Sequence, residues 1–338
     1  MRRFFLIFYL IVVSSQAEAQ TSEQVSEAAL KFLQKGDYSN AVMVLNRGLQ
    51  KSPDDLILNR DLAYTYYLQR DYANALKYIS PLLDREDADV KTYQIGGNIY
   101  KALEEVKACD KMYVKALKKY PTSGALYSEY GELLWARKEG ANAIANWEKG
   151  ISTDPTWPSN YYHAAKYYYA RADKVWSLIY GEIFINMESY SERSGETKLL
   201  LLESYKKFYT TADVFKDYEA AKKSGFENAV ISTLKKYDSE AAGGITPSSL
   251  TAIRTRFVTD WFQTYGKQYP LRLFDQWQYL VREGMFDAYN QWIFGPAANL
   301  PEYQLWVKAN DKAVADFTYY QRNRVFKMPA GQYYGNQK

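Results

Sequence analysis

The sequence predicts an all-α fold made of repeated helical hairpins, and three observations support this prediction. A turn signal recurs every 34 residues, as Pro53, Asp87, Pro121 and Pro155. A small residue recurs with the same period, as Ala29, Ala63, Gly97, Gly131 and Ala165. No segment shows the alternation of apolar and polar residues that predicts a half-buried β-strand.

The order of residues within one period explains why a hairpin should form. The motif KGDYSNA at 35–41 returns as QRDYANA at 69–75, which aligns Gly36, Tyr38 and Ala41 with Arg70, Tyr72 and Ala75. A small residue in each helix lets the two backbones approach closely, a glycine turn reverses the chain, and a proline ends the second helix. A single hairpin cannot bury its own apolar face, so neighbouring hairpins are expected to stack.

These recurring positions resemble the tetratricopeptide repeat (TPR) family. The resemblance covers residues 20–191, with units starting near residues 22, 56, 90 and 124 and a degenerate fifth unit near residue 158. It implies a TPR-type helical-hairpin superhelix, followed by a diverged α-helical C-terminal region. It also implies that the concave side of the superhelix binds a protein or peptide.

Some units depart from the pattern. Pro81 falls inside the second helix of the second unit and should shorten it. Gly96 and Gly97 should weaken the first helix of the third unit by about 1 kcal/mol each relative to alanine. In the fifth unit the apolar segment KVWSLIYGEIFINMES at 174–189 replaces the second helix and is expected to end the array.

The first 19 residues predict a secretory signal peptide. Two arginines precede an apolar run and an Ala-Glu-Ala pattern, which places cleavage between Ala19 and Gln20. The run of ten residues is shorter than the roughly 20 that span a bilayer. No cysteine follows it, so a lipoprotein is not expected. The prediction is export to the periplasm or the cell surface of a Gram-negative bacterium, without a transmembrane segment after signal removal.

The remainder of the chain has a helical period without the strict repeat. Residues 192–245 are predicted as a helical connector, with SERSGE at 191–196 as a linker and short helices that include 213–225. The break AAGGITPSS predicts a boundary, with Thr246 or Ser248 capping a helix that begins near Pro247. Residues 246–328 then form a C-terminal helical region, and 329–338 form a tail.

Catalytic and cofactor signals are weak. His163 is the single histidine and Cys109, the single cysteine, lies at a small core position, so neither a catalytic triad nor a zinc site is expected. No phosphate-binding loop is present, and the charges (43 basic, 39 acidic) form no long run, so no cofactor, metal or nucleic-acid partner is predicted. The chain is expected not to be an enzyme.

One alternative remains open, a glycan-binding or glycan-acting protein that uses its aromatic C-terminal region. Four acids lie there among tryptophans, namely Asp260, Asp275, Glu283 and Asp287 among Trp261, Trp277 and Trp292. Against this, the stretch 273–295 resembles a diverged repeat hairpin in which Gly284 corresponds to Gly36. Most of its aromatic side chains are therefore expected in the core, with Trp292 the exception that could serve a ligand.

The candidate binding residues come from the first helix of each unit. Steps of four and then three residues along these helices define a stripe that faces the concave side in TPR arrays: Arg60, Tyr64, Tyr67, Gln94, Asn98, Lys101, Ser128, Glu132, Trp135, Tyr162, Lys166 and Tyr169. Aromatic rings with occasional charges are typical of interaction hot spots. The Lys and Asn pattern with which some TPR domains bind a C-terminal carboxylate is absent. A protein or peptide partner is therefore expected, such as a cell-envelope complex.

Overall fold

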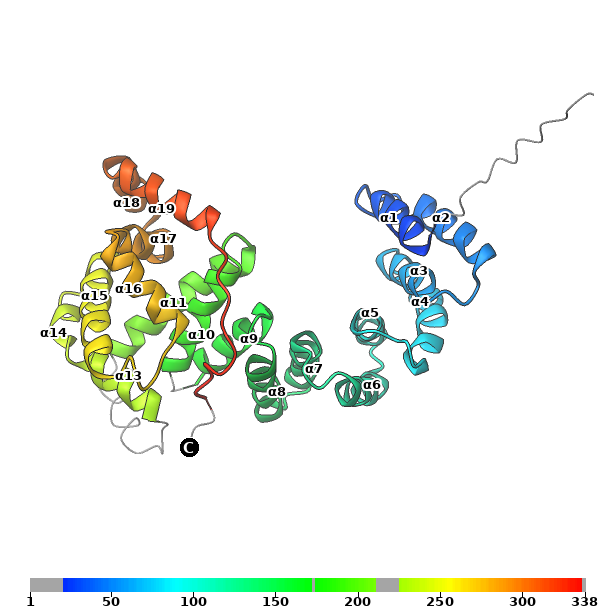
Figure 1. Cartoon of the computed structure of the whole chain (residues 1–338), viewed down its shortest axis with the longest axis horizontal. Helices are drawn as coiled ribbons and strands as arrows, with labels where there is room; N and C mark the ends of the chain where they lie inside the picture. Colours follow the sequence, from blue (N-terminus) through cyan, green and yellow to red (C-terminus); the bar gives the residue numbers. More distant parts are fainter. Residues whose placement is uncertain (1–20, 172–173, 211–224, 336–338) are drawn as a thin grey trace, which may run out of the picture. The chain divides into compact units, whose positions relative to one another are not determined.

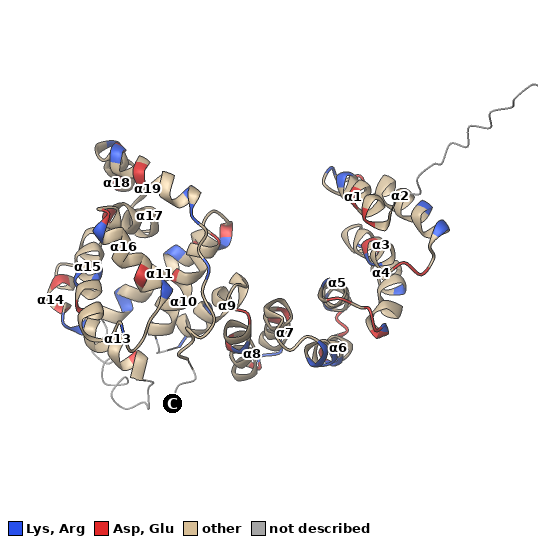
Figure 2. Cartoon of the chain, in the orientation of Figure 1, with Lys and Arg blue, Asp and Glu red and all other residues tan. Residues whose placement is uncertain are grey.

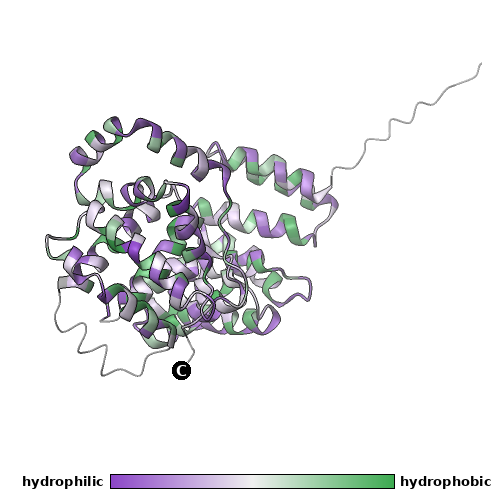
Figure 3. Cartoon of the chain, turned by 60° about the vertical axis from the view of Figure 1, so that its left-hand side comes forward, coloured by the Kyte–Doolittle hydropathy of each residue, from purple (hydrophilic) through white to green (hydrophobic). Residues whose placement is uncertain are grey.

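The computed structural model describes residues 21–171, 174–210 and 225–335, which form two compact units divided after Leu103. The signal peptide, its cleavage site and residues 213–224 of a predicted helix lie outside the described residues. Every regular element that is described is helical, which confirms the all-α helical-repeat fold class (Figure 1). Green and purple residues alternate along the helices in Figure 3, and no described helix is both long and apolar enough to cross a bilayer.

The first unit consists of two complete hairpins and one further helix. Its elements are α1 (Ser22–Leu33), α2 (Tyr38–Lys51), α3 (Leu56–Leu68), α4 (Tyr72–Ile79), a 3₁₀ helix (Ser80–Asp84) and α5 (Val90–Ala102). The small residues predicted at helix contacts are at most 1% exposed, as at Ala29 and Ala41. Pro81 shortens the second hairpin as predicted, because α4 gives way to the 3₁₀ helix at that point.

The second unit continues with helices that keep the same spacing. These are α6 (Val106–Lys119), α7 (Gly124–Ala136), α8 (Gly140–Thr153), α9 (Pro158–Tyr169), α10 (Lys174–Met187) and α11 (Glu192–Thr210). Cys109 is fully buried in α6, as expected. The linker predicted at 191–196 is wrong, because Ser191 caps the backbone N–H of Ser194 and the helix starts there. α11 therefore begins 34 residues after α9, at the first-helix position of a further unit.

The rest of the second unit packs against α10 and α11, with α13 and α16 contacting α10 and α17 contacting α11. It contains α13 (Gly225–Lys235), α14 (Asp238–Ala241), α15 (Pro247–Thr264), α16 (Arg272–Arg282), α17 (Phe286–Ala298), α18 (Leu300–Ala309) and α19 (Asp311–Asn323). Thr246 caps α15 and forms a capping box with Ser249, which confirms the predicted start of this helix. The predicted hairpin within 273–295 is confirmed as α16 and α17. Most of its aromatics are in the core, with Trp277 3% and Tyr289 0% exposed, whereas Tyr279 is 37% exposed and Trp292 is half-buried.

One turn geometry recurs between the paired helices. Gly36, Arg70, Glu104 and Lys138 have φ of 71°, 62°, 59° and 64°, and Gly284 has φ of 69°. At the first of these turns the backbone N–H of Asp37 donates to the carbonyl of Phe32 at 3.0 Å, which satisfies a helix-end acceptor. The left-handed conformation costs an L-residue roughly 1–2 kcal/mol, so only glycine adopts it without strain.

A buried ion pair connects α10 to the C-terminal helices. Arg254 on α15 donates to the carboxylate of Glu182 on α10, and the two side chains are 0% and 1% exposed. The indole of Trp277 and the hydroxyl of Tyr289 donate to the same carboxylate oxygen, at 2.8 and 2.7 Å. The guanidinium carbon of Arg254 also lies 4.2 Å from the ring centroid of Trp277. Three helices thus satisfy one carboxylate, as a buried charge requires.

The segment after α19 is packed rather than free. In Figure 1 it runs back past α10 to the C terminus, and we call residues 324–335 the C-terminal strap. The ring of Tyr334 stacks 4.6 Å from that of Phe226, and its hydroxyl donates to the carbonyl of Pro270 at 2.7 Å. Tyr334 is 6% exposed, so this residue anchors the predicted tail at 329–338 to the core, although residues 329–331 are exposed.

The turn geometry predicts opposite effects of two substitutions. Lys138→Gly should stabilise the protein by about 0.5–1 kcal/mol, because glycine removes the strain of the left-handed conformation. Gly36→Ala should destabilise it by about 1–2 kcal/mol, since the added methyl group has no atom within 4 Å and the loss is purely conformational. Urea unfolding measures both, and a destabilised Lys138→Gly variant would contradict the strain argument.

The buried ion pair generates a second prediction. Glu182→Ala should lower the free energy of unfolding by about 3–5 kcal/mol, because it leaves the Arg254 guanidinium buried without its carboxylate. The double variant Glu182→Leu with Arg254→Met should lose less free energy of unfolding than the sum of the losses in the single variants Glu182→Leu and Arg254→Met. A double-mutant cycle by chemical denaturation gives this coupling, and additive losses would show that the pair does not act as a unit.

Candidate binding surface

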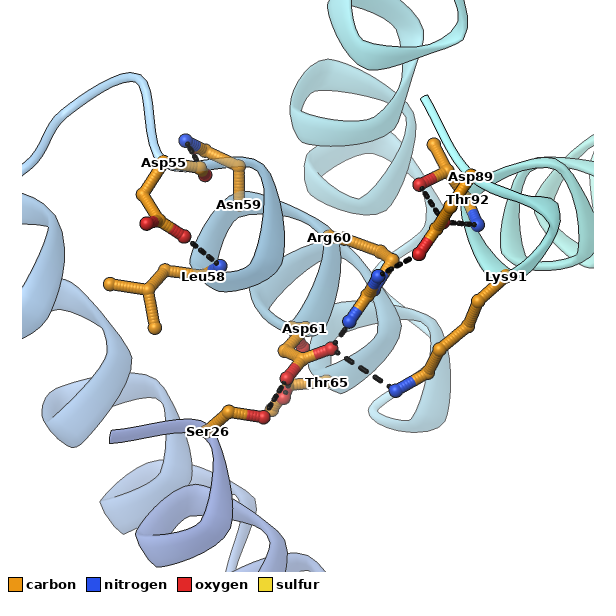
Figure 4. A network of polar contacts seen from close by, with 10 residues as sticks. All are labelled: Ser26, Asp55, Leu58, Asn59, Arg60, Asp61, Thr65, Asp89, Lys91 and Thr92. Carbon is orange, nitrogen blue, oxygen red and sulfur yellow. Dashed lines mark hydrogen bonds and ion pairs between the residues drawn. The ribbon is translucent and has the colours of Figure 1, made fainter. Parts of the chain in front are cut away.

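In the first unit the candidate residues lie on α3 and α5, where Arg60 plays a structural part. Its guanidinium donates to Asp89 at 2.7 Å and to Asp61 at 3.3 Å, and Lys91 approaches Asp61 at 3.5 Å (Figure 4). Asp89 also caps α5 by accepting from the backbone N–H of Thr92 at 2.8 Å. Arg60 is 6% exposed, so it joins α3 to α5 instead of reaching outward.

These contacts shift the pKa of Asp89, the acid that accepts a hydrogen bond from Arg60. Partial burial favours the neutral form of Asp89, but the hydrogen bonds from Thr92 and the charge of Arg60 outweigh it and lower its pKa. Asp89 is therefore ionised at neutral pH. The contact between α3 and α5 is a permanent ion pair under physiological conditions.

The remaining candidates of the first unit form a partly exposed aromatic and polar row. The rings of Tyr64 and Tyr67 stack with centroids 6.2 Å apart, and Tyr67 also lies 6.0 Å from the ring of Tyr72. On α5 three further candidates are half-buried: Gln94, Asn98 and Lys101. Paired tyrosines held by packing lose little freedom on binding, which suits them to contact a partner.

In the second unit the candidates on α9 are joined to α11. The hydroxyl of Tyr162 donates to Glu196 at 2.7 Å, and Lys166 donates to the Tyr162 hydroxyl at 3.0 Å. Lys166 also lies 3.7 Å from the Glu196 carboxylate. These groups line a pocket of about 190 Å³ together with Tyr169 and Leu200. A polar triad thus borders a hollow between two first helices. Tyr162 is itself only 7% exposed, so Lys166 and Glu196 are the members of the triad that reach the surface.

The charge state of this triad follows from its contacts. The hydrogen bond from Tyr162, followed by the charge of Lys166, lowers the pKa of Glu196. Glu196 therefore stays ionised well below neutral pH. The hydroxyl of Tyr162 and the ammonium of Lys166 are held in place by it, so the surface is organised before any partner arrives.

The candidates on α7 connect to this surface through the single histidine. Nε2 of His163 lies 2.7 Å from the carboxylate of Glu132, and its ring stacks 5.1 Å from that of Trp147. Trp135 is 47% exposed and its ring lies 5.9 Å from that of Tyr167. His163 is half-buried on α9 and contacts both α7 and α8.

One part of this surface could have been found from the sequence. Glu196 and Leu200 lie one period of 34 residues beyond Tyr162 and Lys166, but the predicted stripe of binding residues stops at the fifth unit. The small contact residue that marks each earlier unit is replaced by Leu199, which is 51% exposed, so the further unit carries no such signal. Ser128 has the stripe spacing but is only 2% exposed, which removes it from the surface.

The helix α6 is basic, which was not predicted from the sequence. α6 has the sequence VKACDKMYVKALKK, and its lysines make it one of the bluest helices in Figure 2. All of these lysines are exposed: Lys107, Lys111, Lys115, Lys118 and Lys119. These lysines make α6 locally basic, although they form no long run of one charge in the sequence.

The acids of the glycan alternative do not converge on a site. Asp260 pairs with Lys236 at 3.0 Å, Asp287 accepts from Thr251 at 3.1 Å, and Glu283 pairs with its neighbour Arg282. Trp261 is fully buried. Aromatic rings that form the core cannot receive a sugar, so this alternative is not favoured. Within the described ranges no group of three His, Cys, Asp or Glu side chains could hold a metal ion.

Comparisons with known proteins found similarity among solved structures alone. No family model matches the sequence, and no curated protein matches it either. A thermophilic TPR protein from Thermus thermophilus is similar in structure, with 15% identity and a TM-score of 0.44 over 55% of this chain and 99% of that one. A tetratricopeptide repeat protein from Parabacteroides merdae has 15% identity and a TM-score of 0.43 over 76% and 97%.

The triad on α9 and α11 yields a pH prediction. Tyr162→Phe should raise the pKa of Glu196 toward that of an ordinary glutamate, because the carboxylate loses its strongest hydrogen bond. Carbon-13 NMR of the labelled carboxyl group, titrated in both proteins, measures the shift. Tyr64→Phe, a change in the first unit, is the matched control and should leave Glu196 unaltered. An unchanged pKa in the Tyr162 variant would contradict the contact.

Proposed function

We propose that this protein is an exported, non-enzymatic scaffold that binds a protein or peptide partner along the first helices of its repeats. The observation that carries the proposal is the surface on α7, α9 and α11, where exposed Trp135 and the Tyr162, Lys166 and Glu196 triad lie beside an open hollow. Aromatic side chains with fixed charges at their edges are the usual anchors of protein interfaces.

Each part of the chain has a separate role in this proposal. Residues 20–191 form the repeat array, α11 adds the last first helix to its surface, and 246–328 stabilise the end of the array. The apolar run and the Ala19–Gln20 pattern at the start of the sequence support export to the periplasm or the cell surface. No cofactor or metal is part of the proposal.

Photocrosslinking in the native host tests the proposal. A photoreactive residue at Tyr169 in one variant and at Trp135 in another should capture the same specific protein, because both positions belong to the surface on α7, α9 and α11. The control carries the residue at Val114, which is 39% exposed on α6 and lies outside the stripe. Lys166→Glu should reduce capture about tenfold by reversing the charge beside Tyr162. Capture that is absent, or equal at Val114, would overturn the proposal.

A further inference from the structure

A second hollow lies far along the chain from the repeat surface, among α17, α18 and α19. Its wall consists mainly of rings, with a single formal charge: Tyr190, Trp292, Tyr303, Trp306, Phe317 and Arg322. We propose that this hollow, here called the aromatic pocket, binds a protein segment by taking one apolar or aromatic side chain whose neighbour in that segment is acidic. The site is separate from the surface proposed above.

The size of the aromatic pocket favours a single side chain. Its volume is about 110 Å³. A cavity of roughly 150 Å³ accommodates benzene, whereas pockets for whole small ligands usually enclose about 300–1,000 Å³. A leucine or phenylalanine side chain therefore matches the space better than a cofactor or an oligosaccharide does.

The inner wall of the pocket is rigid. Phe317 is 4% exposed, and its ring lies 5.9 Å from that of Trp292, which in turn stacks 6.0 Å from Tyr289. The ammonium of Lys198 lies 3.7 Å from the Trp292 ring centroid. Burial lowers the pKa of Lys198 to about 8, so it is still charged at neutral pH and keeps this cation–π contact. A preorganised wall reduces the entropic cost of binding.

The outer wall offers apolar surface that the described part of the chain leaves uncovered. Trp306 and Tyr303 belong to α18, in which no residue is fully buried. Leu305 on the same helix is 66% exposed, and Leu300 is 51% exposed. Apolar area that surrounds a small pocket is typical of the rim of a protein contact.

Arg322 determines the charge of the ligand. It is exposed at the pocket, and no described side chain forms a hydrogen bond or ion pair with it. Arg324, two residues further, is instead occupied, since it donates to Asn186 at 2.6 Å and to Gln276 at 3.2 Å. A guanidinium beside apolar rings, with no acid in the pocket wall, is complementary to a carboxylate.

The polar groups argue against a sugar. The amide of Gln321 lines the pocket but already donates to Ser189 at 2.8 Å and accepts from Arg324 at 2.9 Å. Lys198 lies over the ring of Trp292, where a sugar would need an open aromatic face. A hydrophobic anchor with one carboxylate requires neither of these groups.

Binding of short synthetic peptides to the full chain tests this proposal. The probe peptides carry phenylalanine next to glutamate in a Gly-Ser background, and matched peptides carry alanine for phenylalanine or glutamine for glutamate. The Phe-Glu peptides should bind saturably in calorimetry. Replacing the glutamate, or introducing Arg322→Gln in the protein, should each weaken binding about tenfold, and the two changes together should not weaken it much further.

Two protein variants separate the pocket from the rest of the molecule. Thr318→Trp should fill the half-buried pocket wall and abolish binding, while circular dichroism and thermal unfolding verify that the fold is intact. Arg282→Gln, which removes an exposed arginine outside the pocket, is the matched control and should bind normally. Trp135→Ala on the repeat surface should also bind normally, so failure of this proposal is distinguishable from failure of the scaffold proposal.

Three results would overturn the proposal. The first is the absence of saturable binding by any Phe-Glu peptide. The second is peptide binding that survives Thr318→Trp in a folded protein. The third is saturable binding of a cell-wall oligosaccharide that Thr318→Trp abolishes, which would assign the pocket to glycan instead.

Discussion

The carboxylate of Glu182 and the guanidinium of Arg254 are both removed from water, and the packing of the second unit depends on how they are satisfied. Removing either charge from solvent costs several kcal/mol, which only a complete set of partners offsets. The partners come from α10, α15, α16 and α17, and the two charged residues are 72 positions apart in the chain. Each helix must reach its native position before the carboxylate is fully bonded. The pair therefore specifies one arrangement of these helices more than it adds stability.

The repeat array is held together by a different principle, that of local contacts repeated with one period. Small residues such as Ala41 and Ala143 let paired helices approach, and side chains one unit apart connect successive hairpins, as Asn160 does when it donates to the carbonyl of Gly124 at 2.9 Å. Such a design can be extended by one helix without changing the others. α11 is that extension, and it brings Glu196 onto the candidate surface. The end of the array thus provides both a binding residue and the base on which the C-terminal helices pack.

Most of the fold was predictable because its determinants are local. The spacing of Ala29, Gly36 and Pro53 is sufficient to predict a hairpin. The glycine turn between α16 and α17 has the same geometry, although the residues at the helix contact there are large. The candidate surface was less predictable. The sequence pattern cannot show that Arg60 forms an ion pair with Asp89, or that Glu196 lies beside Tyr162, because each depends on a contact between successive hairpins. The Glu182 and Arg254 pair could not be predicted at all, since one acid within an apolar run carries no sign of its distant partner.

The C-terminal strap has a consequence for how the molecule is made. Tyr334 completes the packing of Phe226 and holds Pro270, and the side chain of Gln332 accepts from the backbone N–H of Arg272 at 2.6 Å. These contacts involve a segment that is synthesised after the helices it packs against. The first unit can fold while synthesis continues, but the aromatic core of the second unit stays open until residue 334 has emerged.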